Sequence, residues 1–563
     1  MNATARTRDR DPAPQPIAPV PGMELPAAAW TSDAQIVLTP KAAELLVALH
    51  RHFEPERRAL LAARRERQAA WDGGELPDFP PRDTEAVRGG WRVAPIPEDL
   101  LRRRVEITGP CNSPKMVINM LGRAADGIRA DTAMLDFEDA LMPAWGNLMA
   151  GQRNVRAVAE GQLEHEEPAG GGKPRRVYRL DPADMALPIV RPRGLHLLES
   201  NCRVDSAPVS GALFDLALSC FHSAGRLLER GHTPAYYLPK CEDAAEARWW
   251  DAVLAALEDA LGLGRGALKA TFLIETLPAA LQMEEILFAS RDHAVGLNVG
   301  RWDKIFSDIK TLRFHADRIL ADRASITMQR PWMEAYARRC VQISHQRGAL
   351  GLGGMAAFTP GRTPAVRAAQ TEKVRADKRT EHDLGHDGCW VSHPYFIGPA
   401  LEQFPERNQL GVLHREAERY PDLLPQGGGP YTLAGLRTNV RVGIGYLEGW
   451  QRGIGCVAWE DLMEDLATLE ISRAQTWQWL HHGVRLQDGD RAGPAVTEAL
   501  VRRTFAEELE RIVGPECADL AAARGESPAA VAASFERAAR EAEAIFTRSE
   551  LTDFLYEASP PVA

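Results

Sequence analysis

Between Arg104 and about Pro399, short runs rich in β-forming residues alternate with longer helical stretches. Repeated βα units of this kind predict a parallel sheet, and so long a series suits a closed (β/α)8 TIM barrel better than an open sheet. No GxGxxG motif opens a helix after the first strand, which disfavours a doubly wound sheet. The predicted fold class is therefore α/β. The strand candidates include VEITG, AMLDFED, VYRLD, LPIVRPRG, AYYLPK, ATFLIET and AVGLNVG.

The text on either side of this repeat has a different character. Residues 1–30 are rich in Pro and Ala and predict a flexible tail. Residues 31–104 contain two helical patterns separated at Pro55, whose arginines we expect on a solvated face, and then a Pro-rich strap. The barrel is expected over 105–400. The strand pattern disappears after that, so 401–563 is expected to form an all-helical domain.

Composition narrows the class of protein. With 563 residues and a net charge of −10, broad binding to nucleic acid or to an anionic membrane is disfavoured. The eight cysteines are scattered without a CxxC spacing, which suits a reducing compartment. There is no apolar run long enough to cross a bilayer and no secretory signal, and the C-terminus SPPVA is not a peroxisomal SKL signal. A cytoplasmic enzyme is the expectation.

Charged residues stand where several strand candidates end. In a TIM barrel these carboxyl ends carry the chemistry. The positions to examine are Glu138 and Asp139, Arg191, Lys240, Glu275 and the segment after Gly296.

Two of these acids follow successive strands. Glu275 closes ATFLIET and Asp303 closes GLNVGRWD after one intervening helix. Carboxylates that converge in this way can bind Mg²⁺ and leave positions for water and substrate. Acids at the starts of helices are also common as caps, so the spacing alone leaves both interpretations open.

Glycines flank the second acid. Gly296 and Gly300 leave backbone amides open to close approach by an anion, and beside a metal such amides suit a small α-oxo acid. A tight turn that needs glycine for its backbone angles is the equally good alternative.

Arg191 ends the strand in LPIVRPRG. A guanidinium keeps its proton in a protein, so at a strand end it is a fixed cationic donor for an oxyanion or an enolate. An ion pair with Glu138 or Asp139 is the structural alternative, and the two roles are compatible.

One acid in the helical C-terminal region stands out. In EDLMEDLATLEISRAQTWQW, Glu464 and Asp465 precede an apolar helical pattern. They are either first-turn acids favoured by the helix dipole, or Asp465 is a general base brought to the mouth of the barrel. Spacing does not choose between these interpretations.

Many motifs resemble one family, in that family's order. The chain is similar to malate synthase of the shorter A type from about residue 40 to 550, through RRVEITGP, KMVINML, DFEDALMPAW, VRPRGLHL, PVSGALFD, YYLPKCEDAAEARWW, KATFLIET, RDHAVGLNVGRWDKIFSDIK, GGMAA, KVRADK, GHDGCWVSHP, NVRVGIGYLEGWQRGIGC and LMEDLATLEISRAQTWQWLHHG. Several of these motifs are long and specific.

The resemblance implies a TIM barrel with an N-terminal helical clasp and a C-terminal helical plug. It implies a Mg²⁺ cofactor and the condensation of acetyl-CoA with glyoxylate to malate, in the glyoxylate cycle. The site residues that it implies are Arg191 and Asp465 for catalysis, Glu275 and Asp303 for the metal, Gly300, Arg301, Trp302 and Asp303 for glyoxylate, Glu138 and Asp139 as outer acids, and Pro394 for the CoA channel.

The chain departs from the family pattern at three places. Lys304 stands where the family usually has Tyr after GRWD, and residues 111–114 and 140–142 also differ. None of these changes removes an implied catalytic residue, so they bear on substrate preference and rate.

Two alternatives remain at this point. DFEDA also resembles the acidic motif of malyl-CoA and citramalyl-CoA lyases, but those enzymes are shorter and lack the MED-containing tail. A barrel that binds CoA or metal without turnover is the other, and intact Arg191, Glu275, Asp303 and Asp465 argue against it.

Overall fold

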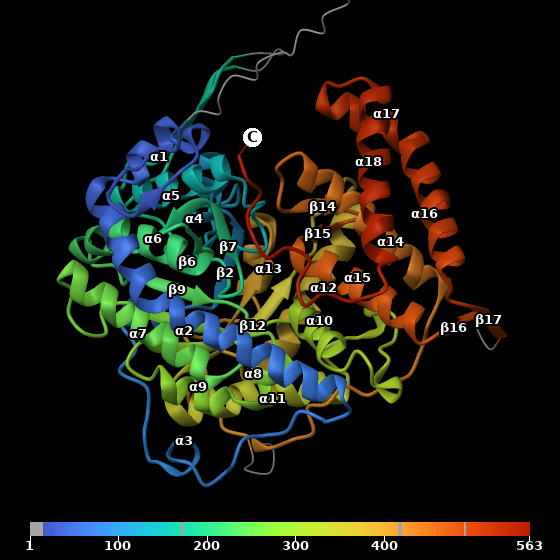
Figure 1. Ribbon diagram of the computed structural model, residues 1–563, viewed down its shortest axis with the longest axis horizontal. Helices are drawn as coiled ribbons and strands as arrows, with labels where there is room; N and C mark the ends of the chain where they lie inside the picture. The colour runs from blue at the N-terminus through green and yellow to red at the C-terminus, as the bar shows by residue number, and fades with distance from the viewer. Residues whose placement is uncertain (1–14, 170–173, 415–418, 489–490, 563) are drawn as a thin grey trace, which may run out of the picture.

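Eight parallel strands close into a barrel at the centre of the chain (Figure 1). The computed structural model describes residues 15–169, 174–414, 419–488 and 491–562. The predicted (β/α)8 barrel is confirmed, and β13 pairs with β2 to close it. In order around the barrel the strands are β2 (Val105–Pro110), β3 (Thr132–Asp136), β6 (Leu187–Arg191), β9 (Ala235–Leu238), β10 (Lys269–Ile274), β11 (Ala294–Val299), β12 (Leu350–Ala356) and β13 (Gly388–Val391).

Helices cover the outside of these strands, which is why the strands are apolar on both faces. Every residue of β10 and β11 is buried. Among the described residues, no helix is long and apolar enough to cross a membrane. The helices of this layer are α4 (Pro114–Leu121), α5 (Trp145–Glu160), α6 (Gly211–Glu229), α7 (Ala244–Leu261), α8 (Leu277–Leu281), α9 (Met283–Ala289), α10 (Trp302–Thr311), α11 (Pro331–Arg347), α12 (Pro364–Asp383) and α13 (Ile397–Leu401).

One strand candidate lies outside the barrel. VYRLD forms β5 (Arg176–Arg179), but β5 pairs only with β4 (Glu164–Glu167) in a separate hairpin. Its residues are largely exposed, which a strand in the wall of a barrel cannot be. The strands β12 and β13 take the last two places, and the glycines of LGLGGMA explain why β12 lacks a strong strand pattern.

The N-terminal helical region is a single long helix rather than two. α2 (Pro40–Asp72) continues through Pro55, and its packing along α6 and α7 offsets the hydrogen bond that proline removes. The expectation that its arginines are all solvated is also wrong. Arg57 and Arg64 are buried, and Arg64 Nε donates to Glu246 Oε1 at 2.6 Å. Two short helices, α1 (Ser32–Val37) and α3 (Glu85–Arg88), flank α2.

Part of the predicted flexible tail is ordered. Residues 1–14 lie outside the described residues, but β1 (Met23–Glu24) pairs with β7 (Leu198–Val204), which itself pairs with β8 (Ala207–Ser210). Met23 and Leu25 are buried. Composition alone predicts that the segment keeps its conformational entropy. Backbone pairing and the burial of these side chains offset the entropy that is lost when the segment becomes ordered.

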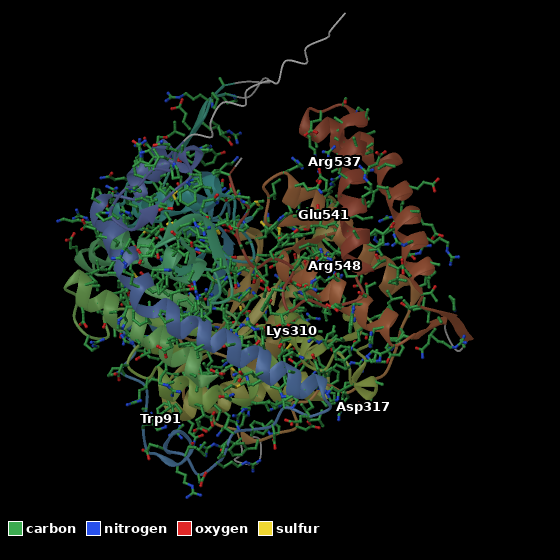
Figure 2. The ribbon with its side chains drawn as sticks, viewed as in Figure 1. Trp91, Lys310, Asp317, Arg537, Glu541 and Arg548 are labelled. Carbon is green, nitrogen blue, oxygen red and sulfur yellow. The ribbon has the colours of Figure 1, made fainter. Side chains whose placement is uncertain are left out.

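The C-terminal region is mostly helical. Its helices are α14 (Leu433–Gln451), α15 (Leu466–His481), α16 (Glu498–Val513), α17 (Pro515–Arg524) and α18 (Pro528–Phe546), which pack beside the barrel (Figure 1). Glu541 of α18, labelled in Figure 2, accepts a hydrogen bond of 2.7 Å from Gln451 of α14.

Two hairpins interrupt this region, so it is not all-helical. They are β14 (Val457–Trp459) with β15 (Leu462–Glu464), and β16 (Arg485–Asp488) with β17 (Arg491–Ala495). The helix expected to begin near Glu460 therefore begins at Leu466. Glu460 and Asp461 have φ angles of 46° and 62°, the left-handed values that a tight hairpin turn requires.

Candidate active site at the carboxyl end of the barrel

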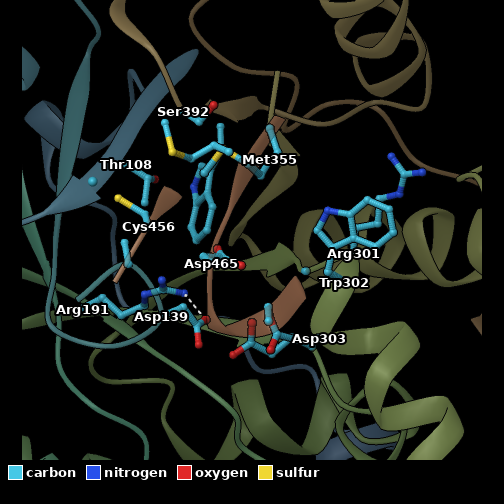
Figure 3. A pocket seen from close by; sticks show the side chains of 18 of the residues that line it. Thr108, Asp139, Arg191, Arg301, Trp302, Asp303, Met355, Ser392, Cys456 and Asp465 are labelled. Atoms are coloured by element: carbon cyan, nitrogen blue, oxygen red, sulfur yellow. Dashed lines mark hydrogen bonds and ion pairs between the residues drawn. The ribbon is translucent and has the colours of Figure 1, made fainter. Parts of the chain in front are cut away.

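The carboxyl ends of the barrel strands surround a cavity of about 90 Å³ (Figure 3). Asp465 and Ala467 of the C-terminal region complete its wall. The structure brings together in this cavity the sequence-predicted residues Asp139, Arg191, Glu275, Gly300, Arg301, Trp302, Asp303 and Asp465. Glu138 is buried beside them, with Oε2 3.4 Å from Arg191 Nη1.

Pro394 lies in a neighbouring recess rather than in this cavity. The recess is open to solvent and has a volume of about 780 Å³. Both spaces are lined by the same residues on their common side, namely Thr108, Gly109, Met116, Ser392 and Met463.

Arg191 is held by a neighbouring strand end. Its Nε and Nη2 donate to the two carboxylate oxygens of Asp136 at 2.7 and 2.5 Å, and its Nη1 donates to Asp139 at 3.2 Å. β3 and β6 bring Asp136 opposite Arg191 in register. Burial opposes the charge, but these carboxylates raise the pKa of Arg191 well above its ordinary value. A guanidinium has five N–H donors, so some remain for a ligand in the cavity.

Asp465 is the N-cap of α15. Its Oδ1 accepts a hydrogen bond from the Thr468 amide at 3.3 Å, and the Thr468 hydroxyl accepts one from the Asp465 amide at 3.0 Å. This capping box explains why Asp465 stands just before the helix and fixes its backbone. Burial, and then the charges of Asp139 and Asp303, raise the pKa of Asp465 to about 8. Such a carboxyl group changes its protonation state near neutral pH.

Glu275 and Asp303 follow β10 and β11, which are adjacent in the barrel. Burial raises the pKa of Glu275 to about 8 and that of Asp303 to about 6, with Lys240 opposing the shift in both cases. A Cβ atom on Gly300 would lie only 2.6 Å from the Glu275 Cβ. Glycine at 300 is therefore what lets the loop after β11 approach Glu275.

The residues Gly300 to Asp303 form the start of α10. Arg301 is the N-cap, and the first-turn amides of a helix have no acceptor within it, so this end of α10 suits an anionic group. The proposal of exposed amides at Gly296 is wrong. Gly296 is buried inside β11, where it pairs with β10 and β12.

The acidic side of the cavity fits a divalent cation. Asp303 Oδ1 and both carboxylate oxygens of Glu138 are buried, and among the described residues only the Lys240 and Arg191 ion-pair contacts of 3.2 to 3.4 Å reach them. Raised carboxyl pKa values mean that a nearby positive charge would favour the ionised forms. No group of three or more His, Cys, Asp and Glu side chains in the described residues is arranged to hold a metal ion, so Glu275 and Asp303 form a pair with outer acids around it.

Sequence reasoning missed two residues of this site. Asp136, which orients Arg191, is the first acid of the DFED run, and its place at the end of β3 was the available signal. Lys240 was marked as a strand-end position without a role. Its ammonium lies 2.9 Å from both carboxylate oxygens of Asp139.

The family models that match the chain cover all three of its regions. They are the malate synthase N-terminal domain over residues 29–85, the malate synthase TIM barrel domain over 187–421 and the malate synthase C-terminal model over 431–558. Malate synthase A of Escherichia coli (strain K12) is 43% identical over 526 residues, which are 92% of this chain and 94% of the relative. The chain belongs to the malate synthase family. With that membership goes malate synthase activity, the conversion of acetyl-CoA and glyoxylate to malate, in the glyoxylate cycle.

Other relatives agree with this assignment. Malate synthase of Myxococcus xanthus (strain DK1622) is 44% identical and covers 90% of this chain and 91% of its own length. The glyoxysomal malate synthase of Ricinus communis is 42% identical over 84% of each chain. The match to the C-terminal model of malate synthase disfavours the lyase alternative, which lacks that region.

The departure at Lys304 is accommodated inside the protein. Lys304 forms a buried ion pair with Asp308 one turn later in α10, and neither side chain is exposed. The charge of Lys304 is therefore balanced within α10 by Asp308.

Proposed function

We propose that this cavity is where the malate synthase reaction takes place, with Asp465 as general base, Arg191 as the donor to the enolate, and Glu275 and Asp303 as the Mg²⁺ ligands. The observation that carries the proposal is the meeting of these four side chains in one cavity, although they come from three barrel strand ends and a separate helical region.

The first chemical step is removal of a proton from the thioester methyl group of acetyl-CoA. This methyl is a very weak carbon acid, so the base must be held against it and the enolate oxygen must receive hydrogen bonds as charge develops. Asp465 Oδ1 is held by the Thr468 amide, which orients the carboxylate. The bidentate contact with Asp136 orients Arg191 in the same way.

The second substrate is a small anion. We place the carboxylate of glyoxylate at the backbone amides of residues 300–303, where the loop after β11 leads into the N-terminal end of α10. Glu275 and Asp303 would hold Mg²⁺, which would supply Lewis-acid polarisation of the glyoxylate aldehyde. Glu138 and Asp139 share the Lys240 ammonium with these ligands, and Asp139 contributes negative charge, since Lys240 and Arg191 lower its pKa against the effect of burial. The enolate carbon then forms the new carbon–carbon bond, and water hydrolyses malyl-CoA.

The neighbouring recess suits the long arm of acetyl-CoA. It adjoins the cavity and is lined by Met116, Met120, Pro394 and Tyr395, with Arg123 among its polar residues. An apolar wall with one cationic side chain fits a pantetheine chain that ends in phosphates. Because the whole chain carries a net charge of −10, such local features have to attract the anionic substrates.

We place the protein in the cytoplasm. In the part of the chain that the structure describes, which includes all eight cysteines, no disulfide is formed, as suits a reducing compartment.

Release of free thiol from acetyl-CoA tests the proposed site. With glyoxylate and Mg²⁺ the protein should release CoA thiol and form malate. In Glu275→Gln the Mg²⁺ concentration needed for half-maximal activity should rise by about tenfold or more. Glu285→Gln, on α9 outside the cavity, is the matched control and should leave that curve unchanged. Absence of glyoxylate-dependent thiol release from folded protein, or an unchanged Mg²⁺ titration in Glu275→Gln, would show that the site is misplaced.

A further inference from the structure

Lys240 lies among the acidic residues at the carboxyl end of the barrel, behind the lining of the cavity. It follows β9, its side chain is 5% exposed, and its ammonium contacts both oxygens of Asp139 at 2.9 Å. The same nitrogen lies 3.3 Å from Glu138 Oε1, 3.2 Å from Asp303 Oδ1 and 3.8 Å from Glu275 Oε1. One lysine therefore contacts both proposed metal ligands and both outer acids.

The backbone of Lys240 is fixed as well. Its φ angle is 51°, a value that costs a non-glycine residue free energy and persists only where the surroundings impose it. The Lys240 amide donates to Glu275 Oε1 at 2.8 Å, and its carbonyl accepts from Arg64 Nη2 at 2.7 Å. Arg64 belongs to α2, so the N-terminal helix helps to fix the backbone of Lys240.

The local charge balance explains what this lysine does. Five carboxylates meet here, and among the described residues only two basic side chains lie within ion-pair distance of them. Arg191 is engaged first by Asp136, with two hydrogen bonds. The other acids, Glu138, Asp139, Glu275 and Asp303, all have Lys240 in common. Buried carboxylates without a cation are strongly destabilising.

We propose that Lys240 is a positioning residue that serves as a resident cation of the metal centre, holding its carboxylates together before the divalent cation binds and weakening the affinity for that cation. This inference rests on the proposed metal site at Glu275 and Asp303.

Two opposite effects follow from one charge. Without a metal, the ammonium neutralises the carboxylates and stabilises the folded barrel mouth. With a metal, the same ammonium is a like charge a few ångströms away and disfavours binding. Removing the charge should therefore make the protein less stable without metal and bind metal more tightly.

The test uses the full chain. The melting temperature is measured in EDTA and again with Mg²⁺ or Mn²⁺ restored, and Mn²⁺ binding is measured after the EDTA treatment. Lys240→Met keeps the length of the side chain and removes its charge. We expect the melting temperature in EDTA to fall by roughly 5 °C, added metal to recover most of this loss, and the Mn²⁺ Kd to tighten by about tenfold or more.

Lys310→Met is the matched control. Lys310, labelled in Figure 2, is also buried, and its ammonium lies 2.9 Å from Glu242 Oε1, away from the cavity. Its loss of stability should be the same with and without metal, and its Mn²⁺ Kd should match that of the unchanged protein. If Lys240→Met behaves as this control does, Lys240 is an ordinary buried ion pair and the inference is overturned.

The outcomes separate this inference from the proposed function. If metal does not stabilise the unchanged protein at all, the metal site itself is wrong and both proposals are overturned. If metal stabilises it but Lys240→Met gains no additional metal response, only the role of Lys240 is overturned. If Lys240→Met cannot be obtained as folded protein, Lys240→Arg and Lys240→Gln are compared by the same measurements. The metal response should match that of the unchanged protein in Lys240→Arg, which keeps the charge, and should differ from it in Lys240→Gln, which removes the charge.

Discussion

The two halves of the active site are built differently. The barrel half consists of strand ends, where Arg191, Glu275 and Asp303 are buried in a dense network of ion pairs. The C-terminal half contributes one carboxylate, Asp465, which is only half-buried and is held by a capping box with Thr468. The barrel half is fixed by its own fold, whereas the position of the proposed base, Asp465, depends on how a second region docks.

That docking combines apolar packing with polar contacts. α15 packs along α10, and Ile471, Ala474 and Trp477 of α15 belong to the same hydrophobic core as the barrel. The Leu466 amide donates to the Asp139 carbonyl at 3.3 Å, and Phe358 forms a β-bridge with Leu462. Arg323, which precedes α11, reaches Glu464 and the first turns of α15. Binding of substrate and metal should therefore be a property of the barrel, and proton abstraction a property of the joined regions.

Asp465→Asn gives the largest expected effect. Asparagine is as good an N-cap as aspartate but cannot accept a proton as a carboxylate does, so turnover should fall by about 10³-fold while the melting temperature stays close to that of the unchanged protein. Thiol release measures the rate. The Mn²⁺ Kd should be unchanged, because the proposed metal ligands belong to the barrel half.

Asp461→Asn is its control, because Asp461 lies in the β14–β15 turn outside the cavity and asparagine tolerates the left-handed backbone there. Near-normal turnover is expected. If Asp465→Asn also keeps near-normal turnover, the base lies elsewhere and the division between the two halves is lost.

The same division explains how far the sequence could be interpreted. The repeat of strands and helices predicted the barrel, and the charged strand ends located Arg191, Glu275 and Asp303, because in a TIM barrel local pattern determines which end of a strand faces the site. The role of Asp465 came only from the family resemblance, since its distance from the barrel mouth depends on long-range packing.

The misassigned elements have the same origin. Pro55 and the VYRLD run were interpreted locally, and in both cases tertiary contacts decided the outcome. The contacts of Lys240 show this most clearly: a lysine after a strand has no visible partners in the sequence, yet its carbonyl is held by Arg64 from a helix 176 positions earlier. Residues that act through such distant partners are the ones that pattern analysis leaves unassigned.

Arg323→Met should lower turnover less than loss of the base does. Its effect should be restricted to the C-terminal half of the site, which carries Asp465. Arg323 Nη2 lies 3.2 Å from Glu464 Oε1, and its Nη1 donates to the Thr468 carbonyl at 3.3 Å. Losing these contacts should shift Asp465 slightly and lower kcat by about tenfold, with the Mn²⁺ Kd unchanged.

The control for Arg323 is Arg437→Met, which removes an ion pair with Glu508 inside the C-terminal region. It should leave kcat near normal. A changed Mn²⁺ Kd in Arg323→Met would show that the two halves are not separable, because a docking contact would then be acting on the metal ligands.

Thr468→Val is the smallest change that still separates orientation of the base from stability. It removes the hydroxyl that accepts a hydrogen bond from the Asp465 amide and donates one to the Asp465 carbonyl. The Thr468 amide remains, so the Asp465 carboxylate keeps its hydrogen bond at Oδ1. We expect a loss of about 1 kcal/mol in the free energy of unfolding and a fall in kcat of about threefold.

Thr497→Val is the control for this variant. It removes the cap of α16, where the Thr497 hydroxyl accepts a hydrogen bond from the Leu500 amide at 3.2 Å, far along the chain from the base. That variant should lose similar stability with no change in kcat. If both variants lower kcat equally, the rate follows global stability, and the capping box has no separate part in orienting Asp465.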